Sequence, residues 1–329
     1  MRICLIPKAT RGGPASFQTR LATELNRRGV ETTFDPNSRP LSAVLVFAGT
    51  KNLISLWRCR RQGIRIVQRL DGINWLHRAH SLGSAYALRA ESLNLQLRLI
   101  RSRLADRIIY QSGFVHEWWE RWFGTAMVPA RVIHNGVSLE EYPPRKEMHD
   151  GTLLVVEGTL QYNDPAREIL SAANGGLVHE GPLRRLTILA ETGSAWESEW
   201  ARYNPRPEVA GLRPRAEVKA RQQNAALFLS MEINPPCPNA IIEALAAGLP
   251  VLAFDTGSAR ELIGAGGETV RYEGNPWRLE VPRNLDALGE VGRQILGGWR
   301  EYSRRARSEA ERRFDIRSIA QSYLETMVG

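Results

Sequence analysis

The chain has 329 residues, of which 43% are hydrophobic and 24% charged, which predicts a globular protein and excludes a disordered or low-complexity one. Its length favours two domains, and its apolar runs, such as residues 41–47, are far shorter than the roughly 18–20 residues needed to span a membrane. The net charge of +9 is unevenly distributed, with +11 over residues 1–150 and −2 over residues 151–329. The basic first half would attract nucleic acid, anionic lipid or a phosphorylated substrate, and charge alone does not choose among them.

In the first half, short β-rich runs alternate with helical stretches. We predict strands at residues 2–6, 30–34, 43–47, 64–70, 107–110 and 131–134, and helices at 14–28, 51–62 and 85–104. This alternation is typical of parallel βα units with helices on both faces of a sheet. The pattern breaks into turn residues near Asn135-Gly136, and we place the end of the first domain at residue 137.

A second alternating series follows. We predict strands at residues 152–156, 186–190, 226–230 and 251–254, helices at 165–173, 215–223 and 239–247, and a helical C-terminus that ends with 316–327. The predicted division is 1–137, 138–312 and a terminal helix at 313–329. Doubly wound domains bind ligands at the carboxyl ends of their strands, so we expect the site in a cleft between the two domains.

The cysteines and histidines predict no metal centre. Three scattered cysteines without a Cys-x-x-Cys pair predict no disulfide framework and a reducing, cytoplasmic compartment. His77 and His80 lie close together, but no carboxylate near them in the sequence completes a metal shell. Nucleic-acid binding would explain the basic charge, but no helix-turn-helix, zinc-finger or aromatic-basic RNA motif is present.

Three segments have residue types suited to binding. Gly12-Gly13 follows the first strand and would let a helix N-terminus approach a phosphate, or would only form a tight turn. Asn135-Gly136 readily takes positive φ, which favours a structural hinge. Asn239 is placed to cap a helix on which Glu243 lies one turn in, where a carboxylate either accepts hydrogen bonds from a diol or is merely a favourable N-terminal charge.

Taken in order, the motifs resemble glycosyltransferase family 4, whose members are retaining, nucleotide-sugar-dependent enzymes of the GT-B fold. The segments are "RGGPASFQTRLATELNRRGVE", "RLDGINW", "LADRIIYQSGFV", "VIHNGVSLEEY", "NPPCPNAIIEALAAGLPVLAFDTGSAREL" and the closing "RRFDIRSIAQSYLETM". The resemblance implies two Rossmann-like doubly wound domains facing across a cleft. It also implies a C-terminal helix that crosses back to the N-terminal domain.

The resemblance also implies a site. The N-terminal domain would hold the acceptor and the C-terminal domain the donor, with Glu243 on the ribose hydroxyls and Asp71 near the transferred sugar as the catalytic residue. The other donor-binding residues implied are Gly12, Gly13, Arg167, Leu212, Arg213, Cys237, Asn239, Ala240 and Ser258. No cofactor or metal is implied beyond a UDP- or GDP-linked sugar as co-substrate.

Two departures from the family pattern stand out. The family commonly has a second glutamate eight residues before the position of Glu243, where this chain has Pro235, and Glu232 is out of register. The family also has an arginine and a lysine after the first strand of the second domain. Here the residues at that place are Thr159, Gln161, Asn163 and Asp164. Neutralising a leaving diphosphate needs a cation, and the candidates are Arg11, Arg167, Arg213 and Arg215.

We therefore predict a retaining, metal-independent glycosyltransferase that acts on a glycan, lipid-linked or small-molecule acceptor in surface polysaccharide, glycolipid or natural-product assembly. The alternatives are a nucleotide-sugar-binding protein with lost catalysis and an epimerase-like enzyme. A helical stripe of leucines and isoleucines with arginines around it either lies on an anionic membrane at its inner face or packs on the sheet. The stripe is Leu93, Leu97, Ile100, Leu104 and Ile108. Trp118, Trp119 and Trp122 either face an acceptor or pack into the core.

Overall fold

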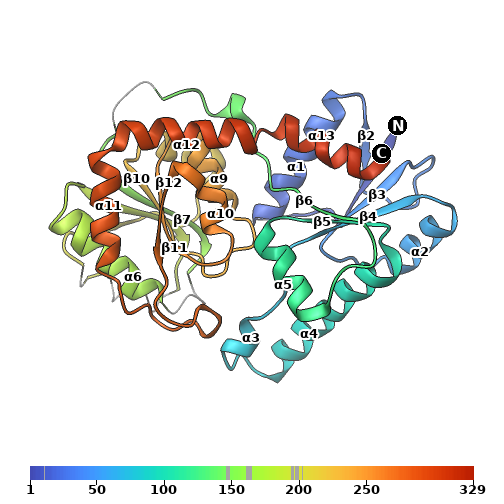
Figure 1. Cartoon of the computed structure of the whole chain (residues 1–329), viewed down its shortest axis with the longest axis horizontal. Helices are drawn as coiled ribbons and strands as arrows, with labels where there is room; N and C mark the ends of the chain where they lie inside the picture. The colour runs from blue at the N-terminus through green and yellow to red at the C-terminus, as the bar shows by residue number, and fades with distance from the viewer. Residues whose placement is uncertain (11, 146–148, 161–164, 194–195, 197–199, 202) are drawn as a thin grey trace. The chain divides into compact units, whose positions relative to one another are not determined.

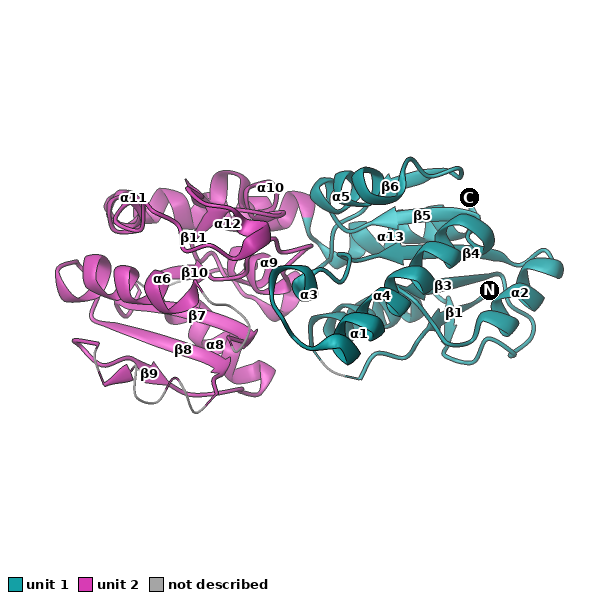
Figure 2. Ribbon diagram, turned by 90° about the horizontal axis from the view of Figure 1, so that it is seen from below, with its two compact units in different colours: residues 1–138, 314–329 teal, residues 139–313 magenta. Residues whose placement is uncertain are grey.

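The computed structural model describes residues 1–10, 12–145, 149–160, 165–193, 196, 200–201 and 203–329. These residues form two compact units, which Figure 2 shows in two colours. Unit 1 comprises Met1–Ser138 and Phe314–Gly329, and unit 2 comprises Leu139–Arg313. The predicted divisions, after residues 137 and 312, each lie one residue before these.

Unit 1 is built on a parallel six-stranded sheet in the order β2-β1-β3-β4-β5-β6. The strands are β1 (Arg2–Ile6), β2 (Glu31–Thr33), β3 (Ala43–Phe47), β4 (Arg65–Leu70), β5 (Arg107–Tyr110) and β6 (Ala130–Val132). The helices are α1 (Gly12–Arg27), α2 (Leu53–Arg61), α3 (Leu76–Ala79), α4 (Ser84–Leu99), α5 (Gly113–Phe123) and α13 (Ile316–Val328). A π-helical turn, η1 (Ile100–Leu104), extends α4.

Both faces of this sheet are covered, as the alternation of apolar runs predicted. Successive strand residues point to opposite faces, so Ile3 and Leu5 pack with α1 and α13 whereas Cys4 and Ile6 pack with α2 and η1. The predicted membrane stripe is mostly part of this core. Its members Leu97, Ile100, Leu104 and Ile108 are at most 9% exposed, so the stripe packs on the sheet. Trp118 and Trp119 are also buried, which confirms the core interpretation for both.

The C-terminal helix belongs to unit 1, as predicted, and Figure 1 shows α13 beside α1. Val137 N donates to Phe314 O at 2.8 Å and Ile316 N donates to Val137 O at 3.0 Å. Neither Asn135 nor Gly136 has positive φ, so the predicted conformation of this turn is wrong. The glycine is needed for close approach, because a Cβ at Gly136 would lie 2.8 Å from Ile316 Cδ1 and 3.0 Å from its Cα.

Unit 2 repeats the plan with a second parallel six-stranded sheet, in the order β12-β11-β10-β7-β8-β9. Its strands are β7 (Thr152–Thr159), β8 (Arg185–Glu191), β9 (Glu208–Val209), β10 (Leu227–Ser230), β11 (Val251–Asp255) and β12 (Gly267–Arg271). Its helices include α6 (Ala166–Ala173), α8 (Arg215–Asn224), α9 (Asn239–Ala246), α10 (Ala259–Ile263), α11 (Ala287–Gly297) and α12 (Trp299–Arg313). The predicted doubly wound architecture is confirmed in each unit.

Candidate functional site

The first candidate segment connects β1 to α1. Gly12 opens α1 with a φ of +71°, and Gly13 follows it on an exposed turn. The loop before them is tied to the helix by Gln18, whose Nε2 donates to Pro7 O at 2.9 Å. The helix start is thus exposed at the carboxyl end of a strand, where helix N–H groups bind anions in other proteins. Arg11 lies outside the described residues.

Asp71, the predicted catalytic residue, follows β4 and is paired with a buried arginine. Arg69 Nη1 lies 2.6 Å from Asp71 Oδ1, and the side chain of Arg69 is 1% exposed whereas that of Asp71 is 29% exposed. Arg69 Nη2 donates to Gln111 Oε1 and to Asn135 Oδ1, each at 2.6 Å. Arg69 Nε donates to Tyr323 OH at 3.1 Å. A charge this deep needs both a counter-ion and hydrogen bonds, and this network supplies both.

The Arg69 network gives Asp71 a structural task. It joins the end of β4, the loop after β5, the Asn135 turn and α13, all within unit 1. Trp119 Nε1 also donates to the main-chain carbonyl of Asp71 at 2.8 Å. The partners come from segments far apart in the sequence, so no local motif announces them. The catalytic role of Asp71 stays a prediction.

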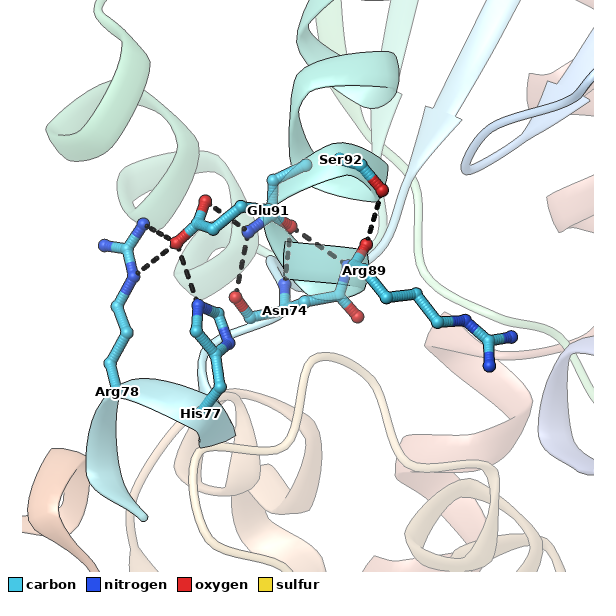
Figure 3. A network of polar contacts seen from close by, with 7 residues as sticks. Asn74, His77, Arg78, Arg89, Glu91 and Ser92 are labelled. Carbon is cyan, nitrogen blue, oxygen red and sulfur yellow. Dashed lines mark hydrogen bonds and ion pairs between the residues drawn. The ribbon is translucent and has the colours of Figure 1, made fainter. Parts of the chain in front are cut away.

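A second polar network ties the loop after β4 to α4 (Figure 3). Glu91 Oε1 accepts from Arg78 Nη2 at 2.7 Å and lies 2.8 Å from His77 Nε2. The hydrogen bond with His77, followed by those with Arg78 and Asn94, lowers the pKa of Glu91 to about 2. Asn94 Oδ1 accepts from Asn74 N at 3.0 Å, and this contact fixes the loop from its other side.

The Glu91 network corrects the view that His77 has no carboxylate near it. Glu91 lies 14 residues further along the chain, on a different helix, and the fold brings the two side chains together. Within the part of the chain that the structure describes, no group of three or more His, Cys, Asp or Glu side chains could hold a metal ion.

In unit 2, the proline-rich loop at residues 234–237 is held by the loop after β11. Ser258 Oγ and Ser258 N both donate to Pro235 O at 2.9 Å, and Ser258 is fully buried. Gly257 has a φ of +58°, and a Cβ there would lie 2.4 Å from Pro235 N. Ser258 and Gly257 thus fix the position of the predicted donor loop. A direct contact of Ser258 with the donor stays a prediction.

The loop leads into α9 differently from the prediction. Pro238 occupies the N-cap position without a side-chain cap hydrogen bond, and Asn239 is already the first helical residue. Capping by Asn239 is therefore wrong, because the extended backbone of Pro238 starts the helix one residue early. Cys237 is 6% exposed, whereas Asn239 and Ala240 are half-buried.

Glu243 lies on α9 with its side chain 12% exposed, beside a cation from the start of α8. Arg215 Nη2 is 3.9 Å from Glu243 Oε1 and 3.5 Å from Glu141 Oε2. Lys219 Nζ also lies 3.2 Å from Glu141 Oε2. Both Arg215 distances are of ion-pair range but not hydrogen-bond geometry, and Arg215 Nε and Nη2 are covered without a hydrogen-bond acceptor. The guanidinium therefore balances Glu243 electrostatically and keeps unused donors.

Three other predicted donor residues of unit 2 have different surroundings. Leu212 is 63% exposed in the loop after β9. Arg213 Nε lies 3.6 Å from Glu217 on α8. Arg167, on α6, stacks on the ring of Trp196 at 5.3 Å from its centroid. Of the candidate cations that the structure describes, Arg215 is the one paired with Glu243.

Two carboxyl groups meet at the carboxyl ends of neighbouring strands of unit 2. Glu157, on β7, accepts a hydrogen bond from Met231 N at 2.9 Å, and Glu232 follows β10. Burial raises the pKa of Glu157 to about 8, and the nearby Glu232 carboxylate adds to the increase. Loss of solvation on burial of its carboxyl group also raises the pKa of Glu232 to about 7, although part of the residue is exposed.

Glu232 is out of register with the second family glutamate, and no motif in the sequence marks Glu157. A signal was available, since each follows an apolar strand run and the two strands are neighbours in the sheet. Thr159, at the end of β7, is exposed where the family places a cation. Gln161, Asn163 and Asp164 lie outside the described residues.

We next compare the chain with families of known proteins. Residues 152–282 match the family model of glycosyl transferases group 1. The matched residues all lie in unit 2 and make up most of it. The match confirms the resemblance inferred from the motifs and supports a glycosyltransferase. None of the curated proteins compared with this chain matches it.

Solved structures extend the similarity in fold to the whole chain. Sucrose-phosphate synthase from Thermosynechococcus elongatus has a TM-score of 0.75 at 17% identity, over 98% of this chain and 97% of that one. HepE of Anabaena, in complex with UDP, has a TM-score of 0.68 at 16% identity, over 99% of both chains. WaaG, a glycosyltransferase involved in lipopolysaccharide biosynthesis, has a TM-score of 0.69 at 15% identity, over the full length of both chains. The chain therefore has the GT-B fold.

The group 1 match covers most of the predicted donor site but none of the acceptor side. It includes Glu243 and Arg215 as well as the pair of Glu157 and Glu232, whereas Asp71 lies in unit 1. None of the helices in the described part of the chain is long and apolar enough to cross a bilayer.

Proposed function

We propose that the protein is a retaining glycosyltransferase that moves a sugar from a UDP- or GDP-linked donor to a hydroxyl of a glycan, lipid-linked or small-molecule acceptor. Its place would be the assembly of a surface polysaccharide, a glycolipid or a natural-product glycan. The group 1 match and the fold shared with HepE, which was crystallised with UDP, support this. The observation that carries the proposal is the partly exposed Glu243 carboxylate beside Arg215 inside the matched domain.

Glu243 is suited to a nucleotide ribose. Two neighbouring hydroxyl groups donate to the two oxygens of one carboxylate, and hydrogen bonds to a charged acceptor are stronger than neutral ones. Arg215, 3.9 Å away, adds positive charge without satisfying the carboxylate with a hydrogen bond of its own.

The reaction would keep the configuration at the anomeric carbon. The bond from that carbon to the donor phosphate breaks, the departing phosphate oxygen takes the proton of the acceptor hydroxyl, and the acceptor oxygen bonds to the carbon on the same face. Gly12 and Gly13 would lie near the diphosphate and Asp71 near the transferred sugar, as the family resemblance implies. The protein would supply orientation and fixed charges.

Arginine rather than a metal ion would neutralise the leaving diphosphate in this proposal. Arg215 is the preferred candidate, because its Nε and Nη2 have no hydrogen-bond acceptor and it already lies beside Glu243. Arg213 pairs with Glu217 and Arg167 stacks on Trp196, and no ion pair joins either of them to Glu243 among the described contacts.

The pair of Glu157 and Glu232 favours a second candidate, a nucleotide-sugar-binding protein with lost catalysis. Two carboxyl groups at the carboxyl edge of the sheet bring no positive charge to a diphosphate, and Thr159 stands where the family has a cation. An epimerase-like enzyme would instead use such a pair as acid and base. The products formed from the bound donor distinguish the three candidates. A transferase gives a glycosylated acceptor, an epimerase gives an epimerised donor, and a binding protein leaves the donor unchanged.

A thermal-shift panel of UDP, GDP, ADP and TDP sugars tests the proposal. We expect one nucleotide to stabilise the protein. Glu243→Ala should weaken its binding at least about 100-fold, because two charge-assisted hydrogen bonds are lost. Glu168→Ala, which removes an exposed carboxylate from α6 of the same unit, is the matched control.

Two results would separate the candidates. Equal nucleotide binding by wild type and Glu243→Ala would refute the donor site itself. Tight donor binding without transfer to any acceptor class would support the nucleotide-sugar-binding protein instead. Arg215→Gln should lower turnover far more than nucleotide affinity, and Arg167→Gln and Arg213→Gln should not.

We also propose that the protein works in the cytoplasm at the inner face of a membrane. The +11 charge of residues 1–150 supports attraction to anionic lipid.

A further inference from the structure

Unit 1 has an apolar groove on its outer helical layer, between α2 and the end of α4. The groove has a volume of about 380 Å³. It is lined by Leu53, Ile54 and Trp57 from α2 and by Leu99, Arg103 and Leu104 from α4 and η1. The surface made by α2, the exposed side of α4 and η1 is called the α2–α4 face below.

Large apolar side chains on this face are exposed in a pattern. On α2, Ile54 is 67% and Trp57 49% exposed. On α4, Leu88, Leu95 and Leu99 are 75%, 64% and 43% exposed. Their spacings of 7 and 4 residues place them on one side of the helix.

This exposed row is distinct from the stripe predicted from the sequence, which packs on the sheet. The helix is therefore apolar on two sides, one buried and one open. Single exposed leucines are ordinary, but a continuous row beside an apolar groove marks an interaction surface.

The charge on the same face is mostly positive, and the acidic residues beside it, Glu91 on α4 and Asp106 after η1, pair with Arg78 and Arg60. Residues 51–65 contain five lysines and arginines and no acidic residue. Residues 92–105 contain three arginines and no acidic residue. Arg58, Arg61, Arg98 and Arg103 are exposed. Arg61 stacks on Trp57 with its guanidinium carbon 4.9 Å from the ring centroid, which places a cation at the edge of the apolar groove.

We propose that the α2–α4 face docks on an anionic lipid bilayer. Ile54, Trp57 and Leu99 would enter the headgroup region, and the exposed arginines would meet lipid phosphates. A partner must be apolar where the groove is apolar and negative around it, and a bilayer with anionic headgroups has both properties over a wide area. Stable peripheral binding needs two signals, apolar insertion and a basic patch, and this face has both. The inference rests on the proposed membrane location but not on sugar transfer.

Vesicle sedimentation tests the proposal with the full chain. We expect binding to phosphatidylcholine vesicles that contain phosphatidylglycerol, weakening as salt rises, and none to phosphatidylcholine alone. Arg58→Gln with Arg61→Gln should lower the partition coefficient about fivefold for each arginine. Ile54→Ser with Trp57→Ser should lower it at least about tenfold.

Matched controls remove similar groups elsewhere in unit 1. Arg121→Gln with Arg131→Gln removes two exposed arginines, and Met127→Ser removes a side chain that is 93% exposed. We expect both controls to bind as the wild type does. Because these are surface changes, thermal midpoints close to the wild type should show that each variant is folded.

Brominated lipids report insertion directly. Trp57→Phe keeps an aromatic ring and should still bind, but it should lose a share of the tryptophan quenching seen with the wild type. The proposal is overturned if the wild type does not bind anionic vesicles, or if the face variants bind them as the controls do. It is also overturned if Ile54→Ser with Trp57→Ser abolishes self-association instead, because the face would then bind a second copy of the chain. Transfer to a water-soluble acceptor should persist in the face variants. Vesicle binding by a chain without transfer activity would contradict the proposed function alone.

Discussion

Replacing Asp71 by Asn removes the counter-ion of Arg69 while keeping the size of the side chain. Arg69 is 1% exposed and would keep its acceptors on Gln111 and Asn135. Breaking a fully buried ion pair from one side costs about 3–5 kcal/mol. Because Asp71 is 29% exposed, water replaces part of what is lost, and we expect the free energy of unfolding of unit 1 to fall by about 2–3 kcal/mol.

The assay must report on unit 1, since a chain of two units need not unfold in one step. Hydrogen exchange of the β4 amides, followed by mass spectrometry, measures opening of the sheet at this place. Glu117→Gln, an exposed neutralisation on α5, is the control and should change little. In the Arg69→Met background, Asp71→Asn should cost much less, because no buried charge remains. Exchange of β4 at the wild-type rate in Asp71→Asn would refute the reasoning and leave Asp71 free for a purely catalytic role.

Two further predictions concern unit 2. Gly257→Ala should lower the free energy of unfolding by about 2–4 kcal/mol, since the new methyl group would lie 2.4 Å from backbone and the φ of +58° disfavours alanine. Urea unfolding measures this change. The control is Gly297→Ala, where a Cβ meets nothing within 4 Å. The raised pKa of Glu157, about 8, means that the folded state keeps a proton that the unfolded state loses above about pH 4.5, so this group lowers stability as pH rises between those values. Glu157→Gln should reduce that fall by up to a few kcal/mol. An unchanged pH profile would contradict the burial of this carboxyl group beside Glu232.

Much of the fold follows from local pattern. The bounds predicted for β1, β3 and β5 are those observed, because each is a short apolar run between polar turns. The strand β12 was missed, since Gly267–Arg271 contains a glycine and two charged residues and pairs only with β11 at the edge of the sheet. The Asn135-Gly136 turn was assigned the wrong backbone, because local propensity carries no information about a helix that arrives from residue 316.

The site was predictable where its residues lie together in the sequence. The segment from Pro235 to Ser258 was identified as one unit, and the structure joins its two ends through the Ser258 hydrogen bonds to Pro235. The partners of Asp71, Glu91 and Glu243 were not predictable. Each is set by packing between segments that no periodicity links, and a single sequence offers no measure of such contacts.

The charges of the two halves suggest different modes of recognition. Residues 151–329 carry −2 overall, so long-range attraction does not bring a negatively charged nucleotide sugar to unit 2. In the proposed function, donor binding there would rest on short-range contacts, namely those of the α9 region and the Glu243–Arg215 pair. The exposed arginines of the α2–α4 face instead act at the distance of a Debye length, about 8 Å at physiological salt. A chain that gathers its positive charge away from its donor domain is therefore better explained by an extended anionic surface than by its donor alone.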